Sequence, residues 1–168
     1  QPGLRLVRFD PEVTRLASRR WTGTLNAPVE FADGFPLLLA SQASLDGLNA
    51  RLTAAGHAAV GIERFRPNLL IDGVEAHDED RLGELHIATA DGAAVLLRPV
   101  KPCARCAIPN VDPATGSASP EVLATLSAYR ADARLAGAIS FGMNCVIVQG
   151  AGATLRAGDA VAADWRFD

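Results

Sequence analysis

The segment from Ala94 to Val100 is apolar apart from one arginine and one proline, and it predicts a strand. Lys101-Pro102-Cys103-Ala104-Arg105-Cys106 follows it directly. A proline fixes its own φ and restricts the residue before it, so the Lys-Pro pair predicts a rigid bend. The fold must therefore place two cysteines, with two cations beside them, at the end of a strand.

These two thiols, Cys103 and Cys106, suit more than one chemistry. Positive charge nearby stabilises a thiolate, which fits disulfide exchange, metal ligation or binding of a phosphorylated, metal-carrying cofactor. Thioredoxin-like exchange is disfavoured, because Pro109 and a β-rich segment follow the pair where that fold has a helix. Structural zinc is disfavoured as well, because the other cysteine and the histidines form no second ligand pair. A purely structural role would leave the two cations unexplained.

The composition is that of one ordinary globular domain of 168 residues, with 49% hydrophobic and 21% charged residues. A net charge of -3 argues against a nucleic-acid partner, which requires a basic surface. No apolar run approaches the roughly 20 residues of a membrane helix, so no membrane segment is expected. Three cysteines with one close pair beside cations indicate a reducing compartment, and we predict the cytoplasm.

Short apolar runs predict a β-rich chain, with strands over 4–9, 35–40, 69–71, 94–100, 145–148 and 153–163. The glycines in Gly150-Ala151-Gly152 predict a hairpin turn between the last two strands. Cys145, within an apolar run, is expected to be a buried core thiol.

Two helices are expected among these strands. One is capped by Ser41 or Ser44 and ended by Gly56, and the other begins at Pro120. Helices and strands do not alternate regularly, which argues against a doubly wound sheet. The sequence therefore predicts an α+β, β-rich fold, a β-barrel with a few helices packed outside.

Several polar segments have a simple structural interpretation. The acidic run from Glu75 to Asp80 is expected to be a solvated loop, with His77 exposed. His86 lies in an alternating segment and is expected to face outward from a strand. The basic cluster at residues 15–21 predicts a solvated loop, a lip that contacts an anionic ligand, or a surface that faces another domain.

Two other segments carry groups suited to a ligand. Arg66 and Asn68 flank a proline, so a guanidinium and an amide project near one spot and can clamp a phosphate or a pterin edge. Asp33 begins an Asp-Gly-x-Pro turn, whose carboxylate either faces a ligand or makes local hydrogen bonds. The residues alone leave both interpretations open.

The Lys101–Cys106 motif, followed by Asn110-Val111-Asp112-Pro113-x-Thr115-Gly116, resembles the signature of the MOSC domain. That module occurs at the C-terminus of molybdenum cofactor sulfurases and in the mitochondrial amidoxime-reducing component. Three further blocks match the same family in the same order: Phe31 to Asn49, Phe65 to Ile71 and Phe141 to Val161. The likeness covers most of the chain and is nearest to the amidoxime-reducing component and the bacterial reductases of N-hydroxylated bases.

The resemblance implies a mixed β-barrel of MOSC type. It further implies that residues 1–168 form a single MOSC domain, the C-terminal part of a longer protein whose N-terminal β-barrel domain is absent from this sequence. The expected function is that of a molybdenum-dependent oxidoreductase that reduces N-hydroxylated small molecules. The alternative is a non-catalytic carrier or recognition module for the molybdenum cofactor or for sulfur.

The resemblance also assigns roles to residues. Cys106 would bind the molybdenum of a molybdopterin cofactor, with Cys103 as its catalytic neighbour. Six further residues would contact or line the cofactor: Arg66, Asn68, Lys101, Arg105, Asp33 and Asn144. Electrons would come from a separate reductase carrying flavin or iron–sulfur groups, and pyridoxal phosphate is not expected in this chain.

Overall fold

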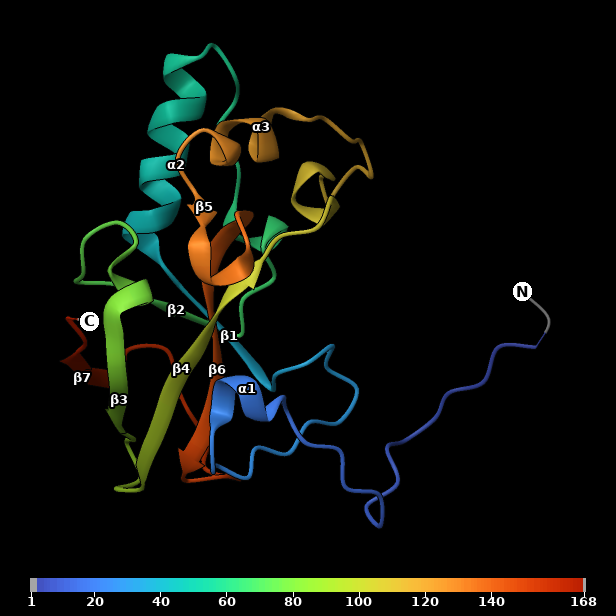
Figure 1. Cartoon of the computed structure of the whole chain (residues 1–168), viewed down its shortest axis with the longest axis vertical. Coiled ribbons are helices and arrows are strands. Elements are labelled where there is room, and N and C mark those ends of the chain that lie inside the picture. The colour runs from blue at the N-terminus through green and yellow to red at the C-terminus, as the bar shows by residue number, and fades with distance from the viewer. Residues whose placement is uncertain (1–2, 168) are drawn as a thin grey trace.

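The computed structural model describes residues 3–167, and its centre is a strongly curved mixed sheet (Figure 1). The strands run in the order β2-β1-β6-β4-β3-β7, and β5 pairs with β6 beside this path. β1 and β2 are parallel, and the other paired strands are antiparallel. The bounds are β1 Leu37–Ser41, β2 Leu69–Ile71, β3 Leu82–Ala88, β4 Ala94–Ala104, β5 Ala131–Asp132, β6 Ala138–Gln149 and β7 Ala160–Trp165.

The curved sheet is a half-barrel, with β2 and β7 as its two edges. A largely apolar cleft of about 430 Å³ lies between those edges, lined by all three residues of β2 and by Val161 of β7. The prediction of an α+β, β-rich fold with a mixed sheet is confirmed. The barrel itself is open, because no pairing joins β2 to β7 within residues 3–167.

The helices are α1 Arg19–Thr22, α2 Gln42–Ala54 and α3 Glu121–Ser127, and α2 and α3 gather at one end of the sheet (Figure 1). α2 begins as predicted, because the side chain of Ser41 accepts a hydrogen bond from the Ser44 N–H. Gly56 follows its end with a φ of 81°, a conformation that glycine adopts without strain. No helix within residues 3–167 is long and apolar enough to cross a membrane.

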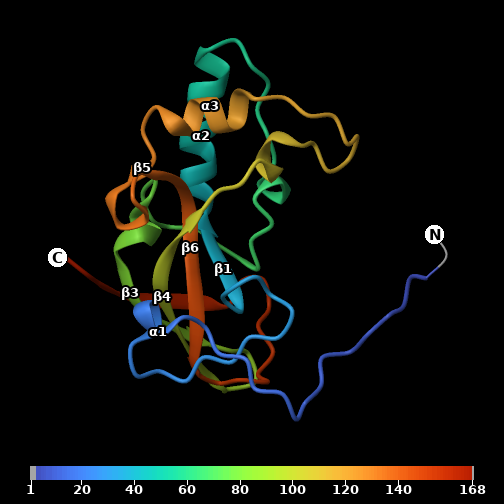
Figure 2. The same ribbon diagram turned by 45° about the vertical axis from the view of Figure 1, so that its right-hand side comes forward.

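Two of the three hydrophobic cores within residues 3–167 hold these layers together. The first fills the concave side of the half-barrel and includes Leu39, Leu85 and Met143. The second joins α2 and α3 to the sheet, where Phe65 stacks on Phe141 with ring centroids 4.0 Å apart. β6 takes part in both cores as it passes between β1 and β4 (Figure 2).

Two of the predicted β elements are wrong. Residues 4–9 are not a strand, and Leu6 is fully exposed there, because alternating apolar residues form a strand only when a partner strand pairs with them. The final strands do not form a hairpin either. β6 pairs with β1 and β4, whereas β7 pairs with β3, so residues 150–159 form a crossing loop between strands that are not neighbours.

The prediction of a solvated acidic loop over residues 75–80 is also wrong. Glu79 is fully buried, and its carboxylate accepts hydrogen bonds from the hydroxyls of Ser41 and Ser44 at the start of α2. His77 is half-buried against Tyr129 and Phe141 rather than exposed. Glu79 is retained in the interior because each hydroxyl partner offsets part of the cost of removing its carboxylate from water.

Candidate functional site

The two thiols of the cysteine motif lie at the end of β4, as the sequence predicts. The strand continues through both of its prolines to Ala104. Its register against β6 shifts between Pro99 and Lys101 and again between Pro102 and Ala104, because proline has no N–H for the ladder. These irregularities turn the strand end outward, where Cys103 is half-buried and Cys106 is exposed.

Both thiols line a hollow of about 390 Å³. Its walls come from the loop before β1, the segment before β2 and the end of β4, with one residue of β6 between them. All but one of the predicted site residues line this hollow: Asp33, Arg66, Asn68, Cys103, Arg105, Cys106 and Asn144. The structure thus brings together residues that are up to about 110 positions apart in the chain.

Asn68 fixes the segment before β2 to the start of β1. Its side-chain oxygen accepts a hydrogen bond from the Leu38 N–H at 2.8 Å, and its own N–H donates to the Leu38 oxygen at 2.9 Å. Next to it, Arg66 has a φ of 56° and precedes a proline, a position where extended backbone is strongly preferred. Such strain persists only where neighbouring contacts impose it, and it is concentrated at functional sites.

Arg105 connects the end of β4 to that same segment. Its Nη1 donates to the Cys103 sulfur at 3.1 Å, and its Nη2 donates to the Phe65 oxygen, also at 3.1 Å. The guanidinium carbon also lies 5.4 Å from the centroid of the Phe65 ring. The Nε of Arg105 is buried and makes no hydrogen bond within the described chain. One N–H donor of this guanidinium group therefore has no protein acceptor there.

Asn144 reaches the hollow from β6, where its neighbours across the sheet are Leu38 and Lys101. Its amide nitrogen donates to the backbone oxygens of Lys101 at 3.3 Å and Pro102 at 3.5 Å. Two residues earlier, Gly142 has a φ of 75°, and a Cβ there would lie 2.5 Å from the Leu39 oxygen. The close contact between β6 and β1, adjacent to the hollow-lining residues Leu38 and Asn144, therefore requires glycine at this position.

Lys101 is the predicted site residue that the structure does not place in the hollow. Its ammonium nitrogen lies 5.8 Å from the centroid of the Trp21 ring and 5.7 Å from that of Phe35. Phe35 lines the hollow and Lys101 does not, so Lys101 supports the wall from behind. Its place in the motif suggested direct contact, but the register of β4 against β6 shifts between Pro102 and Ala104, which interrupts the regular alternation of side chains between Lys101 and Cys103.

Arg15 supports the loop before β1, a role that the sequence did not reveal. Its guanidinium donates to the backbone oxygens of Glu30, Ala32 and Asp33 at 2.8, 2.6 and 2.6 Å. Within the predicted basic cluster, Arg15 therefore neither lies in a purely solvated loop nor forms a lip for a ligand; it holds the loop before β1 in place. Only the fold brings Arg15 to these carbonyls, so no local pattern could have identified it.

Cys145 is excluded from this chemistry, as the sequence predicts. It is fully buried in the barrel core, and burial raises the pKa of its thiol to about 12. The hollow therefore offers two accessible sulfurs, two guanidinium groups and one carboxylate. Guanidinium groups suit phosphate, and an accessible thiol suits a soft metal, so this arrangement favours an anionic ligand that carries a metal.

Known proteins resemble this chain over most of its length. Mitochondrial amidoxime-reducing component 1 of Mus musculus is 36% identical over 129 residues, which cover 75% of this chain and 35% of that protein. Mitochondrial amidoxime reducing component 2 of Homo sapiens is also 36% identical over 129 residues, covering 75% of this chain and 36% of its own length. The chain thus spans about a third of the length of these relatives.

A third relative has another name. Molybdenum cofactor sulfurase of Arabidopsis thaliana is 34% identical over 131 residues, which cover 70% of this chain and 14% of that protein. The family model described as MOSC domain matches residues 26–162, which include every residue that lines the hollow. The chain therefore belongs to the MOSC domain family.

Proposed function

We propose that the hollow binds the molybdopterin form of the molybdenum cofactor, with Cys106 as the protein ligand of the metal. The single observation that supports this most is the convergence of both thiols with Arg66, Asn68 and Arg105 around one hollow. Two separate segments contribute these groups. Arg105 joins one segment to the other through the Phe65 oxygen, and Asn68 joins the second segment to β1. An arginine that only faces solvent would not make these hydrogen bonds between segments.

The donor set suits such a cofactor. Cys106 is an exposed free thiol, whereas the Cys103 sulfur accepts a hydrogen bond from Arg105, so Cys106 is the thiol that is available for a metal. The unused buried Nε of Arg105 and the exposed Arg66 side chain provide donors for a phosphate or a pterin edge. Asp33 and Asn144 would complete the lining at opposite sides.

We further propose that the protein reduces N-hydroxylated small molecules. When bound, the metal of this cofactor supplies two-electron redox chemistry. The chain's own residues would hold the cofactor and position the N–O group, while two protons and two electrons convert that group into N–H and water. The electrons would come from a separate flavin- or iron–sulfur-containing reductase. The names of the two amidoxime-reducing relatives support this substrate class.

The alternative proposal is a carrier or recognition module that holds the cofactor, or a sulfur intermediate, without turnover. The name of the Arabidopsis relative and the open position of Cys106 favour it. In neither case is pyridoxal phosphate expected in this chain. We also propose that the domain is the C-terminal part of a longer protein. The cytoplasmic location stays a prediction, and the names of the amidoxime-reducing relatives place those proteins in mitochondria.

Metal and pterin analysis of the full-length protein tests the proposal. Molybdenum and the fluorescent oxidation product of the pterin should co-purify in equal amounts, and Cys106→Ser should lose the metal. Reduction of benzamidoxime with a chemical electron donor then separates the two functions: turnover supports the reductase, and bound cofactor without turnover supports the carrier. Absence of pterin from the purified protein would refute the reductase and the cofactor carrier, and would leave only the sulfur carrier.

A further inference from the structure

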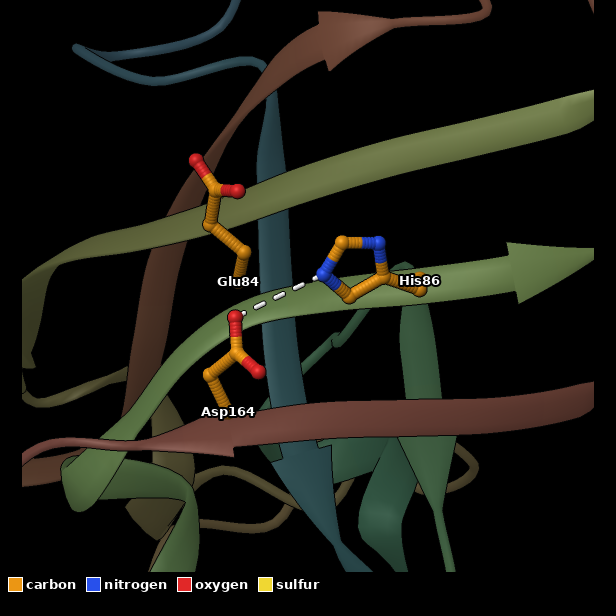
Figure 3. A group of neighbouring side chains, drawn as sticks. All are labelled: Glu84, His86 and Asp164. Atoms are coloured by element: carbon orange, nitrogen blue, oxygen red, sulfur yellow. Dashed lines mark ion pairs between the residues drawn. The ribbon is translucent and has the colours of Figure 1, made fainter.

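A second group of metal-ligating side chains lies on the sheet, outside the hollow. Glu84 and His86 are on β3, and Asp164 is on β7 (Figure 3). One ligand atom from each residue lies within 4.8 Å of the other two. The His86 Nε2 and the Asp164 Oδ2 are 3.5 Å apart. We propose that these three side chains bind a zinc ion.

The strand register produces this arrangement. β3 and β7 are antiparallel, with His86 opposite Ala162. Residues two positions apart on a strand share a face, so Glu84 and Asp164 both project on the same side as His86. Leu85 and Ile87, which alternate with Glu84 and His86 along β3, point into the hydrophobic core. The three ligands therefore lie on the solvent face of the half-barrel. An ion from solution can therefore reach them.

The geometry and chemistry suit zinc. Ligand atoms of a tetrahedral zinc site lie about 3.3 Å apart, given bonds of roughly 2.0–2.1 Å. The His86–Asp164 spacing of 3.5 Å is close to this value, and the Glu84 oxygen, within 4.8 Å of both other ligand atoms, would have to move closer on binding. Zinc accepts imidazole and carboxylate together, with water in the fourth position, whereas magnesium and calcium prefer oxygen alone.

Arg98 of the neighbouring strand β4 positions the carboxylate of Glu84. Its Nε lies 3.0 Å from Glu84 Oε1, and its Nη2 pairs with the same oxygen, so Oε2 is not taken by this ion pair. A ligating carboxylate is commonly oriented by such an outer contact. The positive charge of Arg98 also opposes the metal, so we expect weaker binding than at a site with two unpaired carboxylates.

Zinc at this position would link the edge strand β7 to its neighbour β3. β7 pairs only with β3 within the described chain, and five of its six residues are exposed. An ion held by ligands from both strands binds the folded state alone, because unfolding separates them. Zinc should therefore raise the melting temperature, and the rise should grow with the logarithm of the free zinc concentration once this exceeds Kd.

The test must exclude zinc bound by the motif cysteines. A Cys103→Ser/Cys106→Ser protein serves as the parent, and zinc binding is measured by equilibrium dialysis and by thermal unfolding. We expect one zinc per chain in the parent and a loss of affinity of about tenfold or more when His86→Ala is added. Asp164→Asn should weaken binding as well. His57→Ala, an exposed histidine elsewhere on the chain, is the matched control and should bind as the parent does.

An NMR titration of the parent protein with zinc tests the site without a substitution at His86, in case the His86→Ala variant folds poorly. The chain has three histidines, and zinc should shift the imidazole signals of His86 while leaving those of His57 and His77 unchanged. Zinc binding that survives His86→Ala, or a parent protein that binds no zinc, would overturn the proposal. Neither result depends on the molybdenum cofactor.

Discussion

The guanidinium of Arg105 donates to the sulfur of Cys103 at 3.1 Å, and the same group holds the backbone oxygen of Phe65. One side chain thereby fixes the end of β4 relative to the segment that carries Arg66 and Asn68. The position of the thiols and the position of the two polar donors are therefore coupled, although about forty residues separate them in the chain.

Arg105→Lys is expected to break this coupling. A lysine keeps the charge but cannot donate to the sulfur and to the Phe65 oxygen at the same time. We expect the free energy of unfolding to fall by about 1–3 kcal/mol and the molybdenum content to fall with it. Denaturant unfolding and metal analysis provide the measurements. Arg156→Lys, an exposed residue outside the hollow, is the control, and an Arg105→Lys protein as stable and as well loaded as that control would contradict this role.

Arg15→Lys addresses the loop before β1. The arginine fork donates to three backbone oxygens at once, and one lysine ammonium cannot satisfy all three at the same positions. Hydrogen exchange should become faster at residues 30–34, and pterin retention should fall, while stability changes by only about 1 kcal/mol because the contacts are exposed. Arg19→Lys, from the same basic cluster, should leave the exchange of that loop unchanged. Equal exchange in the two variants would show that Arg15 does not order the loop.

Glu79→Gln tests the buried carboxyl beneath α2. Burial raises the pKa of Glu79 above its ordinary value of 4.5, against the opposing effect of the Ser44 and Ser41 hydroxyls. The folded protein thus holds this proton more tightly than the unfolded chain does. Stability from this group is complete below pH 4.5 and declines as the pH rises toward the raised value. Glutamine does not titrate, so the variant should lack this decline in unfolding measured from pH 4 to 8. An unchanged pH profile would exclude the assignment.

The sequence was most informative where a local pattern and a family block coincide. α2 follows from its serine cap and leucine spacing, and the hollow follows from four blocks that share a family likeness. The prediction failed where a neighbour in space decides the outcome. Residues 4–9 have a strand-like pattern without a partner strand, and the acidic run is buried because Ser41 and Ser44, more than thirty residues away, bind Glu79. The supporting roles of Lys101 and Arg15 likewise depend on contacts that no local pattern encodes.

His77→Phe tests a second titrating group of the interior. Burial, and then the charges of Arg130 and Arg51, lowers the pKa of His77 from 6.5 to about 4. The folded protein therefore resists protonation that the unfolded chain accepts. Stability from this group is complete above pH 6.5 and is lost as the pH falls toward 4, by about 3 kcal/mol at most.

Phenylalanine at this position keeps a ring against Tyr129 and Phe141 but removes the titration. The variant should therefore show a shallower loss of unfolding free energy between pH 7 and 4. The slope is the relevant quantity, because the φ of 70° at this residue adds a strain that does not change with pH. His57→Phe, at an exposed position outside the core, is the control and should keep the slope of the original protein. Equal slopes for His77→Phe and His57→Phe would rule out His77 as the source.

Gly142→Ala tests the close contact between β6 and β1, which is adjacent to the hollow-lining residues Leu38 and Asn144. The new Cβ would lie 2.5 Å from the Leu39 oxygen, and the φ of 75° disfavours any side chain. Gly152→Ala is a matched control, because its φ of 88° carries similar strain while its Cβ meets open space. We expect Gly152→Ala to cost about 1 kcal/mol and Gly142→Ala at least about 2 kcal/mol more, with loss of bound cofactor, since β1 must move away from Asn144. Chemical denaturation of the two variants measures the difference, and equal costs would mean that this contact does not shape the hollow.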